Sequence, residues 1–267
     1  MRCSVVITYF MFSVKAFTNQ LAYRAEVWLR LLGNFVTILI QVEIWKAVIG
    51  SGNVDGVTVE QMITYSVINT LLSALLLNGV SSKVDDSLKS GGIASELVRP
   101  LSYPLYLLFD GLGNSIYQLT FTVAPSFLIA WLFFGILPPS SAANFIAFLG
   151  ALIIALIVSF LLGYFISLLA FWFMNHFALS WTLNGLITVF SGSFLPIWFF
   201  PHYWASLAKA LPFQYMGYVP ATIYLGKMTG TQMWQTLALG MGWIAALLVL
   251  VQWLWARAVR RLVIQGG

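Results

Sequence analysis

The chain has 267 residues, of which 60% are hydrophobic and 8% are charged, and its formal net charge is +5. Soluble globular proteins carry about 25% charged residues, so the composition excludes a soluble protein and predicts an integral membrane protein. The single cysteine, Cys3, excludes an intramolecular disulfide and a cysteine-based metal site.

The segment at residues 1–26 is predicted to be an amphipathic helix that lies at the membrane interface. Thr8, Lys15, Asn19 and Glu26 are separated by seven, four and seven positions, so they share one face of a helix. Apolar side chains cover the rest of that helix, as in helices that lie in the headgroup plane. The alternative interpretation is a poor first membrane span.

Six membrane-spanning helices are predicted after this segment, so the fold class is an all-α integral membrane protein. No Asp, Glu, Lys or Arg occurs between Asp110 and Lys209, and about 20 apolar residues cross a bilayer. Weak alternation of polar and apolar residues argues against a β-barrel. The spans are predicted at residues 27–49, 61–80, 105–136, 144–174, 181–194 and 233–255, within a single transmembrane domain over residues 1–267.

A charged segment at residues 81–104 separates the second and third spans. Its first part is predicted to form a short helix that ends at Gly91 and Gly92, because glycine readily adopts the left-handed conformation after a helix. A second helical turn over IASELV is expected to stop before Pro100 and Pro104. A polar hairpin of this length must lie in water, where it can bind a soluble partner.

The segment at residues 195–230 contains four prolines, many aromatic residues and almost no charge. It is too apolar for a solvated loop and too interrupted for a single span. We therefore expect short re-entrant helices that enter the membrane from one side, with their irregular backbone buried by protein.

The distribution of basic residues predicts the orientation of the chain. Only three of the 13 Lys and Arg residues, namely Lys46, Lys209 and Lys227, fall on one side of a six-span topology, which leaves ten on the other. Cytoplasmic segments carry the excess of Lys and Arg. Both termini and residues 81–104 are therefore expected in the cytoplasm, and residues 195–230 on the outer side.

Motifs for catalysis or for nucleotide binding are absent from the sequence. There is no H-E-x-x-H and no clustered metal-ligand set, and Asp85-Asp86 has no third aspartate at a useful spacing. His176 and His202 are isolated, and Gly226-Lys227 lies in no phosphate-binding loop. We expect that the chain is not an enzyme and binds no cofactor or metal, and that any ATP hydrolysis occurs on another polypeptide.

Three sequence blocks together resemble the permease subunits of bacterial type-2 ABC export systems. The first is SGGIASELVRPLSYPLYLLFDGLG at residues 90–113, where that family has G-x-I followed by L-x-R-P-L-S-Y-P. The second is SGSFLPIWFFPHYWASLAKALPF at residues 191–213, and the third is the RRLVIQGG tail. The resemblance covers nearly the whole chain, including the order of the six spans.

The resemblance implies a half-permease that pairs with an identical or related permease in the bacterial inner membrane. It also implies separate ATPase subunits that bind ATP and magnesium, and a cytoplasmic coupling helix after the second span that inserts into a groove on the ATPase. The two spans and their capped hairpin would then act as a lever. The residues expected to contact the ATPase are Lys89, Ile93, Glu96, Leu97, Arg99 and Pro100.

Few charges but several polar residues are expected along the pathway between the spans. Such a lining suits an amphiphilic, lipid-linked or drug-like substrate better than a small ion, although polar residues in spans also serve helix packing. The residues assigned to the pathway are Asn69, Asn78, Gln118, Ser191 and Ser193.

Two other function classes stay open at this point. A self-contained secondary transporter would need inverted repeats and ion-coupling carboxylates near the middle of the membrane, and neither is visible in the sequence. An intramembrane enzyme would depend on residues such as His176, which has no catalytic neighbour in the sequence.

Overall fold

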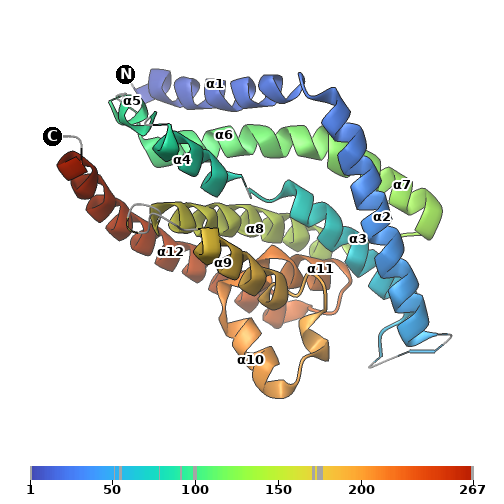
Figure 1. Ribbon diagram of the computed structural model, residues 1–267. Coiled ribbons are helices and arrows are strands. Elements are labelled where there is room, and N and C mark those ends of the chain that lie inside the picture. Colours follow the sequence, from blue (N-terminus) through green and yellow to red (C-terminus); the bar gives the residue numbers. More distant parts are fainter. Residues whose placement is uncertain are drawn as a thin grey trace.

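The computed structural model describes residues 2–50, 52–53, 56–77, 79–90, 92–98, 101–169, 172 and 177–265. Its long elements are helices, and they form one elongated bundle (Figure 1). The main apolar core lies between α3, α8, α11 and α12, where Leu161, Ile223 and Val251 are buried. In chain order, the elements are α1 (Arg2–Gln20), α2 (Arg24–Ile49), α3 (Val59–Leu75), α4 (Val80–Lys89), α5 (Ile93–Leu97), α6 (Tyr103–Gln118), η1 (Leu119–Val123), α7 (Ala124–Phe134), α8 (Ala142–Leu169), α9 (Phe177–Phe190), η2 (Ile197–Phe199), α10 (His202–Ala210), η3 (Pro212–Met216), α11 (Tyr218–Tyr224) and α12 (Gly230–Gln265).

The amino-terminal helix is shorter than the predicted 1–26 segment. α1 ends at Gln20 because Leu21, Ala22 and Tyr23 donate backbone hydrogen bonds three residues back, which forms a tight turn. Glu26 therefore belongs to the first turn of α2, where its carboxylate pairs with Arg30 at 2.6 Å. Residues 8, 15 and 19 of the expected polar face therefore belong to α1, whereas residue 26 belongs to α2.

Among the residues that the structure describes, four helical segments are long and apolar enough to cross a membrane. They are Ala25–Ile49, Tyr103–Phe134, Ala142–Leu169 and Gly230–Ala258, and they correspond to the first, third, fourth and sixth predicted spans. The second and fifth predicted spans correspond to α3 and α9, which have 17 and 14 residues. Both are shorter than the ~20 residues that a straight crossing needs, so the count of six spans stays a prediction.

The long segment Tyr103–Phe134, formed by α6, η1 and α7, contains an irregular turn that the sequence analysis did not predict. α6 passes through the π-helical turn η1 before continuing as α7, and Pro125 lies in the first turn of α7. Proline has no amide hydrogen and clashes with the carbonyl four residues earlier in a regular α-helix. That carbonyl belongs to Phe121 inside η1, where the wider turn accommodates the proline.

Residues 195–230 form short helices, several of which are enclosed by protein. Every residue of α11 is buried, whereas most of α10 is exposed. The Asn144 side chain of α8 donates to the backbone oxygens of Ile223 at 2.6 Å and Met228 at 3.4 Å. This irregular backbone is therefore satisfied by the protein itself, as membrane depth would require.

The start of α1, α5 and the end of α12 lie at the same end of the bundle (Figure 1, upper left). Arg257 and Arg260 of α12 lie towards this end. α10, which carries Lys209, and the carboxyl end of α2 lie away from it (Figure 1). The predicted topology requires this grouping of the chain ends and the hairpin.

Candidate functional site

The hairpin formed by α4 and α5 is anchored in the main core by two apolar side chains. Val84 of α4 is 0% exposed and Ile93 of α5 is 4% exposed, and both belong to the cluster that contains Tyr103 and Leu107 of α6. A hairpin held only by solvent-exposed charges would be free to move by itself. Here, a displacement of α4 and α5 must displace the helices against which they pack.

A hydrogen bond joins the two helices of the hairpin. Ser87 of α4 donates from Oγ to Oε2 of Glu96 in α5 at 3.0 Å. Glu96 is half-buried and also lines a small recess with Phe12 of α1 and Tyr103 of α6. One side chain of α5 therefore lies where α1, α4 and α6 meet.

A salt bridge joins the hairpin to α6. The Nζ atom of Lys83 lies 2.6 Å from Oδ2 of Asp110 and 5.0 Å from the centre of the Tyr106 ring. Burial by itself lowers the pKa of Lys83, but the hydrogen bond and charge of Asp110, together with Tyr106, outweigh it and raise the pKa above the ordinary lysine value. Lys83 is therefore positively charged at neutral pH.

α1 packs along α6 and completes this unit (Figure 1). The Tyr9 hydroxyl accepts a hydrogen bond from the backbone N–H of Ser102 at 2.7 Å, and Ser13 donates from Oγ to the Phe109 carbonyl at 2.5 Å. Gly113 of α6 lies directly against the Ser13 backbone, because a Cβ at this position would collide with the Ser13 carbonyl oxygen. The small residue permits the close approach of the two helices.

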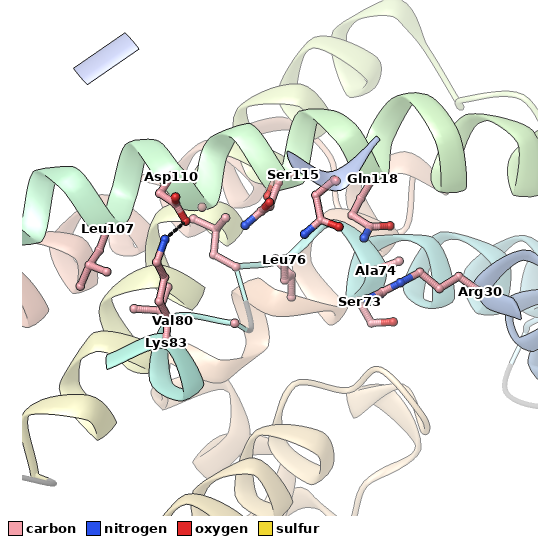
Figure 2. Close-up of a pocket in the computed structure, with 15 residues that line it drawn as sticks. Arg30, Ser73, Ala74, Leu76, Val80, Lys83, Leu107, Asp110, Ser115 and Gln118 are labelled. Carbon is pink, nitrogen blue, oxygen red and sulfur yellow. Dashed lines mark ion pairs between the residues drawn. The ribbon is translucent and has the colours of Figure 1, made fainter. Parts of the chain in front are cut away.

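A cavity of about 400 Å³ lies next to the hairpin, between α6 on one side and α3 and α4 on the other. Figure 2 shows the Lys83–Asp110 pair at one end of the cavity and Arg30 at the other, near Ser73 and Gln118. Leu76, Leu107 and Val80 supply apolar wall. Polar and charged groups from five helices, namely α1, α2, α3, α4 and α6, which the sequence analysis did not bring together, therefore line one cavity.

The predicted ATPase contacts occupy different kinds of position. Ile93 is buried inside the chain, and Glu96 is half-buried at the junction described above. Lys89 ends α4 and Leu97 ends α5, whereas Arg99 and Pro100 lie outside the described residues. Ile93 thus holds the hairpin from within and is not an exposed contact in this chain.

Val98, which the sequence analysis did not select, is 85% exposed and directly follows α5. An exposed apolar side chain at the end of a polar hairpin is a natural contact for a partner protein. The sequence signal for this residue is its spacing from Ile93. Five positions place two residues on different faces of a helix, so Val98 is exposed where Ile93 is buried.

Three of the predicted pathway residues lie together, but in a packed junction. Ser191 and Ser193 are 2.7 Å apart at their Oγ atoms. A Cβ on Gly217 would lie 2.5 Å from Oγ of Ser193 and 2.7 Å from Oδ1 of Asn69. Gln118 lies instead in the cavity, and Asn78 falls outside the described residues.

No metal-ligand set occurs in the part of the chain that the structure describes, since no three His, Cys, Asp or Glu side chains gather there. Lys83 and Asp110, which belong to different elements, form an ion pair rather than a ligand set. The chemistry that this arrangement offers is binding and mechanical coupling.

Comparison with known proteins identifies the family. No curated protein matches the chain. The family model described as "ABC-2 family transporter protein" matches residues 32–266, which include α3 to α12 and therefore the hairpin, the cavity and the short helices before α12. Because this match covers most of the sequence, and because the chain has several helices able to cross a membrane, the chain is a membrane protein that belongs to the ABC-2 transporter family.

Proposed function

We propose that this chain is the permease subunit of an ATP-binding-cassette exporter, in which the α4–α5 hairpin receives movement from a separate ATPase. Family membership implies association with ABC ATPase subunits. The observation that carries the proposal is the attachment of the hairpin: Ile93 is buried in the core and Lys83 pairs with Asp110 of α6. A displacement of the hairpin would therefore move α6 and α1 with it as a rigid body.

The remaining parts of the proposal follow from the same topology. The hairpin end of the bundle lies in the cytoplasm of a bacterial cell, both termini are on that side, and the chain crosses the inner membrane six times. A second permease, identical or related, completes the pathway. ATP and magnesium bind to the ATPase subunits and not to this chain, which has no enzyme activity of its own. The polar cavity supports an amphiphilic substrate.

Site-specific photocrosslinking tests whether the hairpin contacts an ATPase. Benzoylphenylalanine replaces Val98, which is 85% exposed beside α5, or Tyr203, which is 74% exposed on α10 as a matched control. We expect a crosslink from position 98 to an ATP-binding subunit in the native membrane, identified by mass spectrometry, and none from position 203. A crosslink to the ATPase from position 203 alone, or from neither position although the ATPase is present in the membrane, would overturn the proposal.

Paired serine variants test the same contact by co-purification in mild detergent. Ser95 of α5 is exposed and donates to the Gly92 carbonyl at 2.8 Å, while Ser206 of α10 is exposed and donates to the His202 carbonyl at 2.9 Å. A bulky cation at the hairpin should block docking, so Ser95→Arg should lose the ATPase and Ser206→Arg should retain it. Equal retention of the ATPase by both variants would overturn docking at the hairpin, whereas the absence of any ATPase from the wild-type preparation would favour the secondary-transporter alternative.

A further inference from the structure

Among the described residues that line the cavity beside the hairpin, one cation has no acidic partner in the same lining. Lys83 and Asp110 form a pair at 2.6 Å and cancel each other. Arg30 also lines the cavity, and its partner Glu26 is outside the cavity lining. The formal charge of the lining side chains is therefore +1, and Arg30 carries it.

The bond between Arg30 and Glu26 leaves the guanidinium able to bind a second anion. Two contacts join the side chains, from Nε of Arg30 at 3.1 Å and from Nη2 at 2.6 Å, and both go to Oε1 of Glu26. Guanidinium has five N–H donors in a planar fork that matches phosphate and carboxylate geometry. The pair is also 46% exposed on each side, and exposed i,i+4 pairs are weak, so an anion inside the cavity competes with Glu26 easily.

One hydrogen-bond acceptor at the same end of the cavity has no donor partner. Oε1 of Gln118 is buried and has no hydrogen-bond partner in the part of the chain that the structure describes. Figure 2 shows the Gln118 side chain at the Arg30 end, with Ser73 across from it. A buried acceptor of this kind is satisfied by a hydroxyl or an N–H group of a ligand. The ligand that fits therefore carries an anionic oxygen and, close to it, a donor.

The surroundings of this end are apolar and open. Leu76 and Ala74 form part of the cavity wall, and Figure 2 shows Ala74 near Arg30. In the first turns of α2, Trp28, Leu29 and Leu32 are exposed by 73%, 70% and 60%, so this half of the helix is not covered by the rest of the chain. Since Ala25–Ile49 is a candidate membrane span, the exposed apolar side chains contact lipid, and a molecule can enter beside them with its tails outside the cavity.

We propose that the Arg30–Gln118 end of the cavity binds the headgroup of a membrane amphiphile that carries a phosphate next to a hydroxyl or amino group. Arg30 binds the phosphate, Gln118 accepts from the neighbouring hydroxyl or amino group, and the acyl chains lie along the exposed part of α2. This inference rests on the proposed permease function, because it names the chemical class of the amphiphile and the place where its headgroup binds.

Photolabelling of the purified full-length chain in mild detergent tests this binding without any ATPase. The probe is phosphatidylglycerol with a diazirine in one acyl chain, and the comparison probe is the diacylglycerol with the same chain. We expect Arg30→Gln to reduce labelling by the phosphatidylglycerol probe about tenfold, because a charge-assisted bidentate contact is lost. Labelling by the diacylglycerol should be weak and should not change, and Arg30→Lys should restore part of the phosphatidylglycerol signal.

Two further variants separate specific binding from general attraction and from misfolding. Arg257 is an exposed arginine on α12, where it stacks on the Trp253 ring at 3.9 Å. Arg257→Gln removes the same charge elsewhere and should leave labelling unchanged. Gln118→Leu keeps every charge and should reduce labelling several-fold by removing the acceptor. Labelled peptides should map to α2 or α6.

The proposal is wrong if Arg30→Gln labels like the wild type, or if Arg257→Gln and Arg30→Gln lose signal equally. It is also wrong if excess inorganic phosphate displaces the lipid probe completely, since the site would then bind free phosphate and not a headgroup. The assay needs no ATPase, so a missing crosslink at position 98 would overturn the permease function while leaving this binding result intact. Conversely, a crosslink at position 98 with unchanged labelling of Arg30→Gln would overturn only the headgroup site.

Discussion

Removal of the Lys83–Asp110 ion pair should loosen the hairpin from α6. The changes are Lys83→Met, Asp110→Asn and the double substitution. Nζ of Lys83 lies 2.6 Å from Oδ2 of Asp110, and the two side chains are 38% and 15% exposed. This pair is the one ion pair between α4 and α6 in the described residues, so its loss tests how much the hairpin depends on it.

The expected size follows from the unequal burial of the two groups. Exposed pairs contribute about 0–1 kcal/mol, whereas leaving one partner of a buried pair unpaired costs about 3–5 kcal/mol. Lys83→Met leaves the mostly buried Asp110 carboxylate unpaired and should lower the free energy of unfolding by about 2 kcal/mol. Asp110→Asn leaves an ammonium that water can reach and should cost about 1 kcal/mol. The double variant should cost about as much as Asp110→Asn, which gives a coupling energy of about 2 kcal/mol.

Thermal unfolding in detergent, followed by tryptophan fluorescence, measures these differences. Each kcal/mol should shift Tm by about 2–4 °C for a domain of this size. Because the pKa of Lys83 is raised in the folded chain, its stabilising effect is complete below the ordinary lysine pKa of about 10.4 and is lost only as the pH rises through the higher folded value. The Tm differences should therefore be the same from about pH 6 to about pH 9.

Additive losses of stability, with no coupling between the two substitutions, would refute this account of the pair. A Tm difference that disappears between pH 6 and 9 would refute the assigned charge state of Lys83.

Two glycine positions give further predictions. Gly113→Ala places a methyl group against the Ser13 backbone and should separate α1 from α6. The expected cost is about 1–3 kcal/mol, measured as a lower Tm. The control is Gly150→Ala, whose Cβ meets no atom within 4 Å and which should leave Tm unchanged or raise it. Gly217→Ala places a Cβ 2.7 Å from Oδ1 of Asn69 and should cost a similar 1–3 kcal/mol by disrupting the buried junction before α11; a Tm equal to that of the wild type would show that this junction adapts without strain.

The class of the protein was predictable from composition and local pattern. A charged fraction of 8% and a stretch from Asp110 to Lys209 without charge leave little alternative to membrane helices. The hairpin helices also lie where the glycine and proline pattern places them, since α4 ends at Lys89 and α5 begins at Ile93. These features are set by residues that are close together in the sequence, so they can be predicted from one sequence without the tertiary structure. The family resemblance, carried by short motifs in order, was confirmed by the family match.

Residues far apart in the chain contact one another only in the folded bundle, and no local sequence pattern predicts such contacts. Ile93 was expected to contact the ATPase, whereas the fold buries it in the core of this chain and leaves Val98 exposed. The pathway residues were grouped by polarity, yet Gln118 lies beside Arg30 while Asn69 lies against Gly217.

By itself, the sequence determined the membrane class, the approximate helices and the family, because hydrophobicity, helix-stopping residues and short motifs act over neighbouring positions. Only the tertiary structure decided that Lys83 would pair with Asp110, that α1 would lie against α6, and that Arg30 would close one end of a polar cavity. These contacts join separate helices, and they depend on how side-chain volumes fit when the helices pack.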